Sequence, residues 1–228
     1  MRKTGAIFVH FLTASGVVCT LFAFVAIADG DFATVFLWLG LALFIDAVDG
    51  PLARLVDTKR HLPRFSGERL DLIVDYLNYV ALPAFIIVAH PIITGVPGML
   101  AGAMILLSSL FHFSDMNSKT GDGYFVGFPA IWNVVVFYLF AFRLQGDIAL
   151  VIILFLVFLT FVPLRWVHPF RVVKLRKLTV IMVFLGALSA FGTVMGGFTP
   201  GVLEQAGLLA APVYLVFVSL NRTIRNMA

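Results

Sequence analysis

Long apolar runs separated by short polar connections dominate the pattern along this 228-residue chain. A helix of about 20 apolar residues is long enough to cross the hydrocarbon core of a bilayer. Eight runs approach or reach that length, and we expect each to form a transmembrane helix. They cover residues 6–28, 32–55, 67–93, 97–113, 128–145, 148–164, 178–196 and 202–220. The pattern therefore predicts an all-α, polytopic integral membrane protein.

The composition agrees with this pattern. Hydrophobic residues make up 61% of the chain, charged residues only 12%, and the mean hydropathy is +1.03, which excludes an ordinary soluble domain. The net charge of +4 suits Lys and Arg side chains beside anionic lipid headgroups. No basic stripe interleaved with exposed aromatic residues remains outside the runs, so no nucleic-acid partner is expected.

The distribution of basic residues orients the eight spans. An even number of spans places both termini on one side, and of the sixteen Lys and Arg residues all but Arg143 then lie on that side. The positive-inside rule makes that side cytoplasmic. Both termini are therefore predicted to be cytoplasmic.

Acidic residues gather where the second run ends and the third begins. Asp46 and Asp49 are spaced i, i+3, and Asp71 and Asp75 are spaced i, i+4, so each pair projects from one helix face. An antiparallel arrangement of the two helices would bring the pairs together at the cytoplasmic side. The alternative is a solvated acidic fringe at the membrane surface, which would not require the small residues Gly50 and Ala53 in register with the acids.

Such a cluster predicts bound cations. Carboxylates about 4–6 Å apart repel by about 3–4 kcal/mol per pair at an effective dielectric constant near 20, and unpaired charge is costly beside a bilayer. Oxygen ligands favour Mg²⁺ or Mn²⁺ over Ca²⁺ for catalysis, and the absence of His and Cys argues against zinc. We expect two ions, held by Asp46, Asp49, Asp71 and Asp75.

Neighbouring residues suit a diphosphate. Gly50 and Ala53 allow a bulky group to approach the backbone, and the planar guanidinium of Arg54 matches phosphate oxygens. In the first run, Thr13 and Gly16 belong to a small, polar patch suited to helix packing or to contact with a nucleotide.

These residues together form the pattern D-x-x-D-G-x-x-A-R followed by G-x-x-x-D-x-x-x-D, which resembles the signature of the CDP-alcohol phosphotransferases. The pattern comprises Asp46, Asp49, Gly50, Ala53, Arg54, Gly67, Asp71 and Asp75. The resemblance implies metal-dependent transfer of the phosphatidyl group of CDP-diacylglycerol to an alcohol, with release of CMP. It also implies that Asp75 is the catalytic base.

The resemblance has further implications for the site and the assembly. Contacts with CDP-diacylglycerol are implied for Asp49, Gly50, Ala53, Arg54, Gly67 and Asp71. A bacterial inner-membrane location and a homodimer are also implied, with membrane lipids as surroundings. The chain is then one membrane domain, residues 1–228, in which 1–165 form the family-like core and 166–228 add two helices.

Two features resemble the branch of this family that uses choline as the acceptor. Twelve residues separate Arg54 from Gly67, a longer gap than most of the family has, and the polar segment 114–133 is the second feature. Choline carries a quaternary ammonium that aromatic faces bind, each worth about 0.5–2 kcal/mol. The candidates are Tyr76, Tyr79, Tyr124, Trp132 and Tyr138. With 24 Phe, 5 Tyr and 3 Trp in the chain, ordinary interfacial aromatic residues are the alternative interpretation.

Other acceptors and one other class of protein stay open. Serine, glycerol 3-phosphate and inositol phosphate are alternative acceptors, and Lys59, Arg60 and Arg64 would suit the phosphorylated ones. A divalent-cation transporter also places acids in helices. Transporters usually hold such ligands near the bilayer midplane on broken helices, whereas these acids lie at the ends of two runs.

Overall fold

A computed structural model describes residues 2–90, 92–121, 123–169 and 175–227, and it confirms the all-α, polytopic prediction. Two short strands contain three residues each, and the other regular elements of the described residues are helices. The elements are α1 (Arg2–Ala28), α2 (Phe32–Val56), α3 (Thr58–His61), α4 (Gly67–Tyr76), η1 (Leu77–Ala81), α5 (Leu82–Ala89), α6 (Gly95–Ser114), β1 (Tyr124–Val126), α7 (Trp132–Ala141), α8 (Gly146–Thr160), β2 (Arg165–Val167), α9 (Arg176–Met195) and α10 (Val202–Met227).

Local capping sets the limits of the two acid-bearing helices. Helix α2 begins after Asp31, whose carboxylate accepts the N–H of Thr34 at 3.1 Å, and ends where Asp57 turns left-handed at φ 51°. Helix α4 begins after Ser66, whose hydroxyl accepts the N–H of Arg69 at 3.3 Å. Only the one-turn helix α3 lies between them, so the connection is not a continuous helix.

Helices α4, η1 and α5 form one continuous rod, Gly67–Ala89. Its middle turn is π-helical: the N–H of Leu82 donates to the carbonyl of Leu77, five residues back. Such turns widen a helix by one residue and are frequent at functional sites. The hydrophobic pattern of the chain does not predict this π-helical turn.

The helix that falls furthest short of its predicted length is α7. Within the described residues, six helices are long and apolar enough to cross a membrane, and two further apolar helices, α7 and α8, are shorter. The helix predicted over 128–145 is only Trp132–Ala141, a rise of about 15 Å against a hydrocarbon core of about 30 Å. Ala130 at φ 55° and Arg143 at φ 52° take the flanking residues out of the helix.

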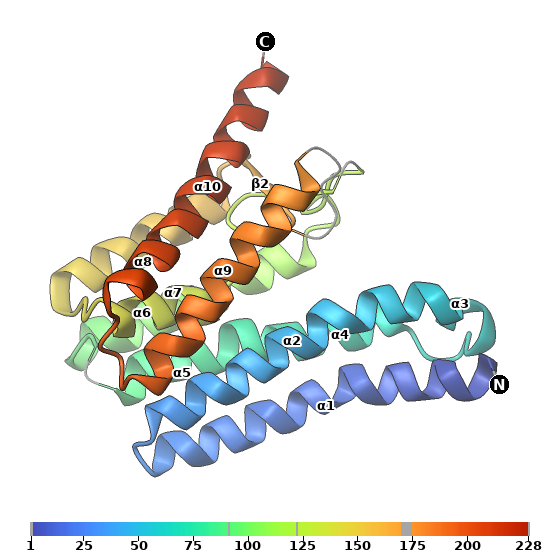
Figure 1. Cartoon of the computed structure of the whole chain (residues 1–228), viewed down its shortest axis with the longest axis horizontal. Helices are drawn as coiled ribbons and strands as arrows, with labels where there is room; N and C mark the ends of the chain where they lie inside the picture. The colour runs from blue at the N-terminus through green and yellow to red at the C-terminus, as the bar shows by residue number, and fades with distance from the viewer. Residues whose placement is uncertain (1, 91, 122, 170–174, 228) are drawn as a thin grey trace.

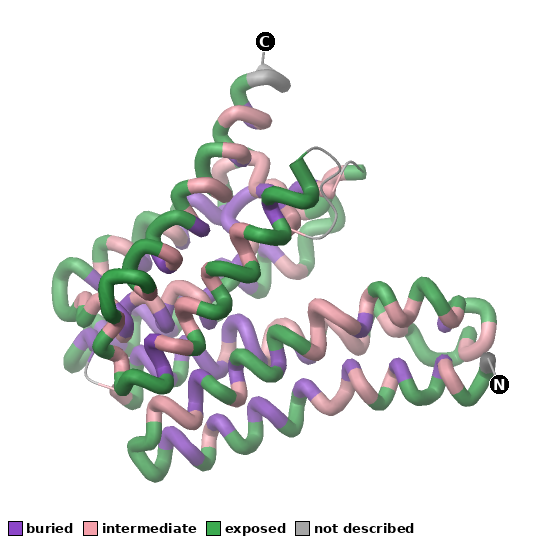
Figure 2. The backbone as a smooth tube through the Cα atoms, in the orientation of Figure 1, coloured by how far each residue is buried: buried purple, intermediate pink, exposed green. Residues whose placement is uncertain are grey.

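The helices pack tightly at one end and diverge at the other (Figure 1). At the packed end the rings of Phe36, Phe140 and Phe198 contact one another, with centroids 5.1–5.5 Å apart. At the other end the α9–α10 pair leads away from α1, α2 and α4 (Figure 1). Buried positions are dense around α5, α6 and α7 and sparse along α9 and α10 (Figure 2).

Part of the polar segment 114–133 belongs to a two-stranded antiparallel sheet. Strand β1 pairs with β2, with Phe125 opposite Trp166. The sheet is fixed to α10 because the N–H of Val167 donates to Ser219 Oγ at 3.0 Å. This pairing joins segments about forty residues apart and was not predicted.

Candidate metal and substrate site

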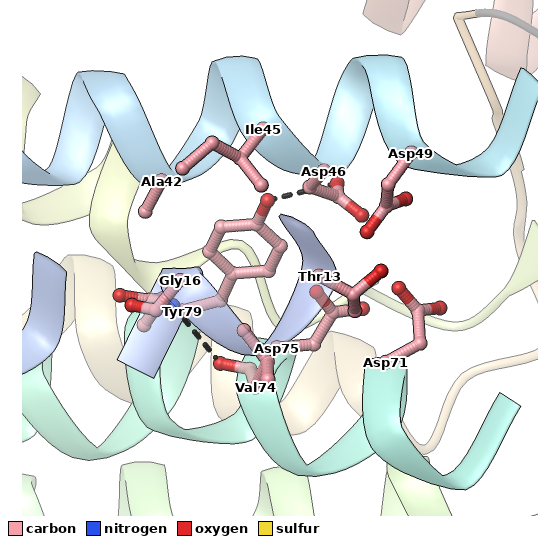
Figure 3. Close-up of a pocket in the computed structure, with 11 residues that line it drawn as sticks. Thr13, Gly16, Ala42, Ile45, Asp46, Asp49, Asp71, Val74, Asp75 and Tyr79 are labelled. Carbon is pink, nitrogen blue, oxygen red and sulfur yellow. Dashed lines mark hydrogen bonds between the residues drawn. The ribbon is translucent and has the colours of Figure 1, made fainter. Parts of the chain in front are cut away.

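The four acids of the sequence pattern converge between α2 and α4 (Figure 3). One carboxylate oxygen from each of Asp46, Asp49 and Asp71 lies within 4.8 Å of the other two. Asp75 lines the same cavity. Asp49 is 5% exposed, and the other three are partly buried. The predicted meeting of the two pairs is confirmed.

The enclosed space between these side chains is small, about 10 Å³. A cavity of that size holds about one water molecule or an ion. It is too small to enclose a nucleotide or a lipid headgroup. The cavity is lined by Thr13, Gly16, Ala42, Ile45, Asp46, Asp49, Asp71, Val74, Asp75, Asn78 and Tyr79.

The donor set fits a hard divalent cation. Three carboxylate oxygens lie within 4.8 Å of one another, and the lining residues offer neither sulfur nor imidazole. Carboxylate oxygens are the ligands of Mg²⁺ and Mn²⁺ in proteins. A cation there would also relieve the mutual repulsion of the acids.

Helix α1 holds the two acid-bearing helices in place by packing against both. Gly16 allows the close approach: a Cβ there would lie 2.6 Å from Val74 Cγ1. Thr13 lines the cavity together with Asp49, and its hydroxyl donates to the Val9 carbonyl at 3.2 Å. The small, polar patch of the first run therefore serves helix packing at Gly16 and faces the acids at Thr13.

The remaining residues of the pattern flank the cavity. Arg54 is exposed on α2, and its Nη1 would lie 3.5 Å from a Cβ at Gly50. Pro51 follows Gly50 inside the helix. At the start of α4, a Cβ at Gly67 would lie 3.0 Å from Cε1 of His10, so this glycine allows α1 to pack against α4. Ala53, one turn beyond Gly50, accepts the N–H of Asp57 through its carbonyl.

Of the five predicted aromatic residues, Tyr79 lies in the cavity. Its hydroxyl donates to Asp46 Oδ2 at 2.8 Å (Figure 3). Tyr76, on the same rod, donates instead to the carbonyl of Leu106 at 2.9 Å, and its ring packs against Phe113.

The other three aromatic residues lie away from the cavity lining. Trp132 is fully buried and donates its indole N–H to Ser109 Oγ at 2.8 Å. Tyr138 donates to the carbonyl of Leu208 at 2.6 Å. Tyr124 is buried in β1 with the guanidinium of Arg222 over its ring.

Sequence reasoning missed two residues beside the acids. Asn78, 2% exposed, lines the cavity from the π-helical turn. Lys119 is exposed in the segment before β1, close enough to Asp75 for electrostatic attraction, with its Nζ 5.8 Å from the centre of the Phe125 ring. Neither residue belongs to a sequence motif, and the fold of segment 114–133 alone brings Lys119 toward the acids.

The fold and the site define a multi-pass α-helical membrane protein with a carboxylate cluster suited to a divalent cation. No family model matches the chain. The phosphatidylcholine synthase of Agrobacterium fabrum is 42% identical over 208 residues, which cover 91% of this chain and 86% of that protein. The phosphatidylcholine synthase of Pseudomonas aeruginosa is 40% identical over 227 residues, 99% of this chain and 95% of that protein. The one from Bradyrhizobium diazoefficiens is 39% identical over 227 residues, 99% and 85% of the two chains.

Identity at this level along nearly the whole length shows that the chain belongs to the phosphatidylcholine synthase family. It is therefore an enzyme of phospholipid biosynthesis.

Proposed function

We propose that the chain transfers the phosphatidyl group of CDP-diacylglycerol to choline, giving phosphatidylcholine and CMP. The observation that carries this proposal is the convergence of four acids in a chain that is 40% identical, along 99% of its length, to a phosphatidylcholine synthase. The reaction joins a lipid with two acyl chains to a water-soluble alcohol, which suits a site at the ends of membrane helices.

In this proposal Asp46, Asp49 and Asp71 hold the divalent cations, Mg²⁺ or Mn²⁺, and Asp75 contributes to a second ion. When bound, the ions supply charge neutralisation at the diphosphate. Arg54 is exposed beside Gly50, and its guanidinium neutralises further phosphate charge. Gly50 and Ala53 leave the α2 backbone accessible to the nucleotide, while Gly67 keeps the start of α4 against α1.

Asp75 acts as the base. The choline hydroxyl loses its proton to the Asp75 carboxylate as its oxygen forms a bond to the phosphatidyl phosphorus. The bond between that phosphorus and the bridging oxygen breaks, and CMP leaves with the bridging oxygen. Lys119, close enough to Asp75 for electrostatic attraction, contacts phosphate oxygens of the substrate in this proposal.

The acceptor part of the proposal rests on membership of the phosphatidylcholine synthase family and on Tyr79. Tyr79 is the predicted aromatic residue that lines the cavity, and we assign its ring the contact with the quaternary ammonium, for which the cavity of about 10 Å³ would have to widen. Tyr124, Trp132 and Tyr138 are engaged elsewhere, so we give them no direct contact with choline.

The positive-inside rule supports a site on the cytoplasmic side of the bacterial inner membrane, where both termini would also lie. Nucleotide-linked lipid and divalent cations are available there. The homodimer implied by the family resemblance stays a prediction.

The test is an acceptor panel. Purified protein in detergent receives CDP-diacylglycerol and Mn²⁺ or Mg²⁺, and CMP release is followed with choline, serine, inositol phosphate or glycerol 3-phosphate. We expect release with choline only, and its loss when EDTA removes the metal. Release with another alcohol would overturn the choline assignment while keeping the acidic site, and release unaffected by EDTA would overturn the metal assignment.

A further inference from the structure

We propose that Tyr79 is a positioning residue for Asp46: its hydroxyl holds the carboxylate in the orientation that a divalent cation requires. The inference goes beyond the proposed function, from which it takes only that the acidic cluster holds a cation. It assigns the Tyr79 hydroxyl a part separate from any contact of the ring with choline.

The contact itself is specific. Tyr79 is 8% exposed, and its hydroxyl donates to Asp46 Oδ2 at 2.8 Å, across from the rod to α2 (Figure 3). A hydrogen bond to one carboxylate oxygen restricts the side-chain torsions of the aspartate and so orients the carboxylate. Asp46 is also one of the three acids whose oxygens lie within 4.8 Å. Hydrogen-bond partners of metal ligands orient the ligand, and their removal typically weakens metal binding about 10–100-fold.

The backbone that carries Tyr79 is held firmly. Tyr79 lies in the π-helical turn next to Asn78, whose amide donates to the carbonyls of Gly16 at 3.1 Å and Val74 at 3.2 Å. Asn78 in turn accepts the hydroxyl of Thr20 at 2.8 Å. Asn78 thus ties the turn to α1, and Tyr79 ties it to α2. The turn therefore links the three helices around the acids.

Two substitutions on the same rod separate this role from a general disturbance. Tyr79→Phe removes the hydroxyl and keeps the ring face that choline would contact. Tyr76→Phe is the matched control, because it removes a hydroxyl that donates to the carbonyl of Leu106, away from the cavity. Both variants keep the size and shape of the side chain.

The measurement is Mn²⁺ binding in detergent without lipid substrate, followed by the electron paramagnetic resonance signal of free Mn²⁺. We expect Tyr79→Phe to raise the dissociation constant about tenfold or more, and Tyr76→Phe to leave it within about twofold. At saturating Mn²⁺, CMP release by Tyr79→Phe should recover, and its KM for choline should equal that of the wild type.

Unchanged Mn²⁺ binding by Tyr79→Phe would overturn the inference, and so would equal weakening in both variants. Either result could stand beside intact choline-dependent CMP release, so the inference can fail while the proposed function holds. Wild-type protein that bound no Mn²⁺ would reject the metal site and the inference together.

Discussion

The rod Gly67–Ala89 and the α9–α10 pair are similarly apolar but differ in how they are buried. Mean hydropathy in their apolar stretches is 1.9 for the rod, 2.1 for α9 and 1.6 for α10, yet 50% of those positions are buried in the rod and only 17% in each of the other two. Apolar content therefore indicates that a helix lies in a membrane and does not indicate whether protein or lipid surrounds it. The rod differs by the polar side chains that it directs toward α1 and α2.

The polar contacts of the α9–α10 pair lie within the pair or reach β2 and Tyr138, away from the acids. The hydroxyls of Thr179 and Tyr214 lie 2.9 Å apart, and Gly207 faces Ser189. Those of the rod, at Asn78 and Tyr79, instead join three helices around the acids. Substitutions in the two regions should therefore have unequal effects on catalysis.

The largest effect is expected from Asp75→Asn on the rod. Loss of the base should lower turnover about 10²–10⁴-fold while CDP-diacylglycerol affinity changes little. CMP release and a separate lipid-binding measurement report the two quantities. Asp147→Asn, an exposed acid at the start of α8, is the control and should leave both unchanged. Equal losses of turnover and affinity for Asp75→Asn would reject its assignment as base.

A smaller effect is expected from Gly16→Ala at the packing face of the rod. The new Cβ would lie 2.6 Å from Val74 Cγ1, and a β-branched side chain in a helix has little freedom to move away. Overpacking of this kind destabilises by about 1–3 kcal/mol, so the thermal midpoint in detergent should fall, and CMP release with it.

The matched control for this substitution is Gly40→Ala on α2, where a Cβ would meet nothing within 4 Å. It should unfold at the same or a higher temperature, because alanine favours the helix by up to about 1 kcal/mol. Equal midpoints for Gly16→Ala and Gly40→Ala would show that α1 and the rod are not closely packed.

The smallest effect is expected from Gly207→Ala in the C-terminal pair. Its Cβ would clash with Ser189 Oγ, a hydroxyl that can rotate away, although Ser189 Cβ would remain at 3.0 Å. The change in unfolding free energy should be near or below about 1 kcal/mol, and CMP release should be unaffected. Adding Ser189→Ala should restore the thermal midpoint. A loss of activity as large as that of Gly16→Ala would show that the pair is coupled to the site.

The sequence predicted the parts of the structure that depend on local patterns. The limits of α1, α2, α6 and α9 lie within a few residues of the predicted runs, because apolar length and capping residues act locally. The meeting of Asp46, Asp49 and Asp71 was predictable for the same reason: helical spacing places each pair on one face, and one connection brings the faces together.

Long-range contacts account for what the sequence did not predict. The helix around Trp132 is short because residues on both sides take left-handed φ values that no hydrophobic period reveals. The pairing of β1 with β2 rests on three residues each, too few for an alternating pattern. The π-helical turn preserves the apolar composition of the rod, so the contact of Tyr79 with Asp46 became visible only in three dimensions.

Pro51 makes the acid-bearing turn of α2 easier to bend than the rest of that helix. A proline inside a helix has no N–H to donate to the carbonyl four residues before it, here that of Ala47, which lies between Asp46 and Asp49. The turn that carries both acids is therefore held by one hydrogen bond fewer than its neighbours, and it is the natural place for this 25-residue helix to bend. The first acid pair thus belongs to a compliant turn, while the second lies on a rod tied to α1, so adjustment of the site during turnover should come mainly from α2.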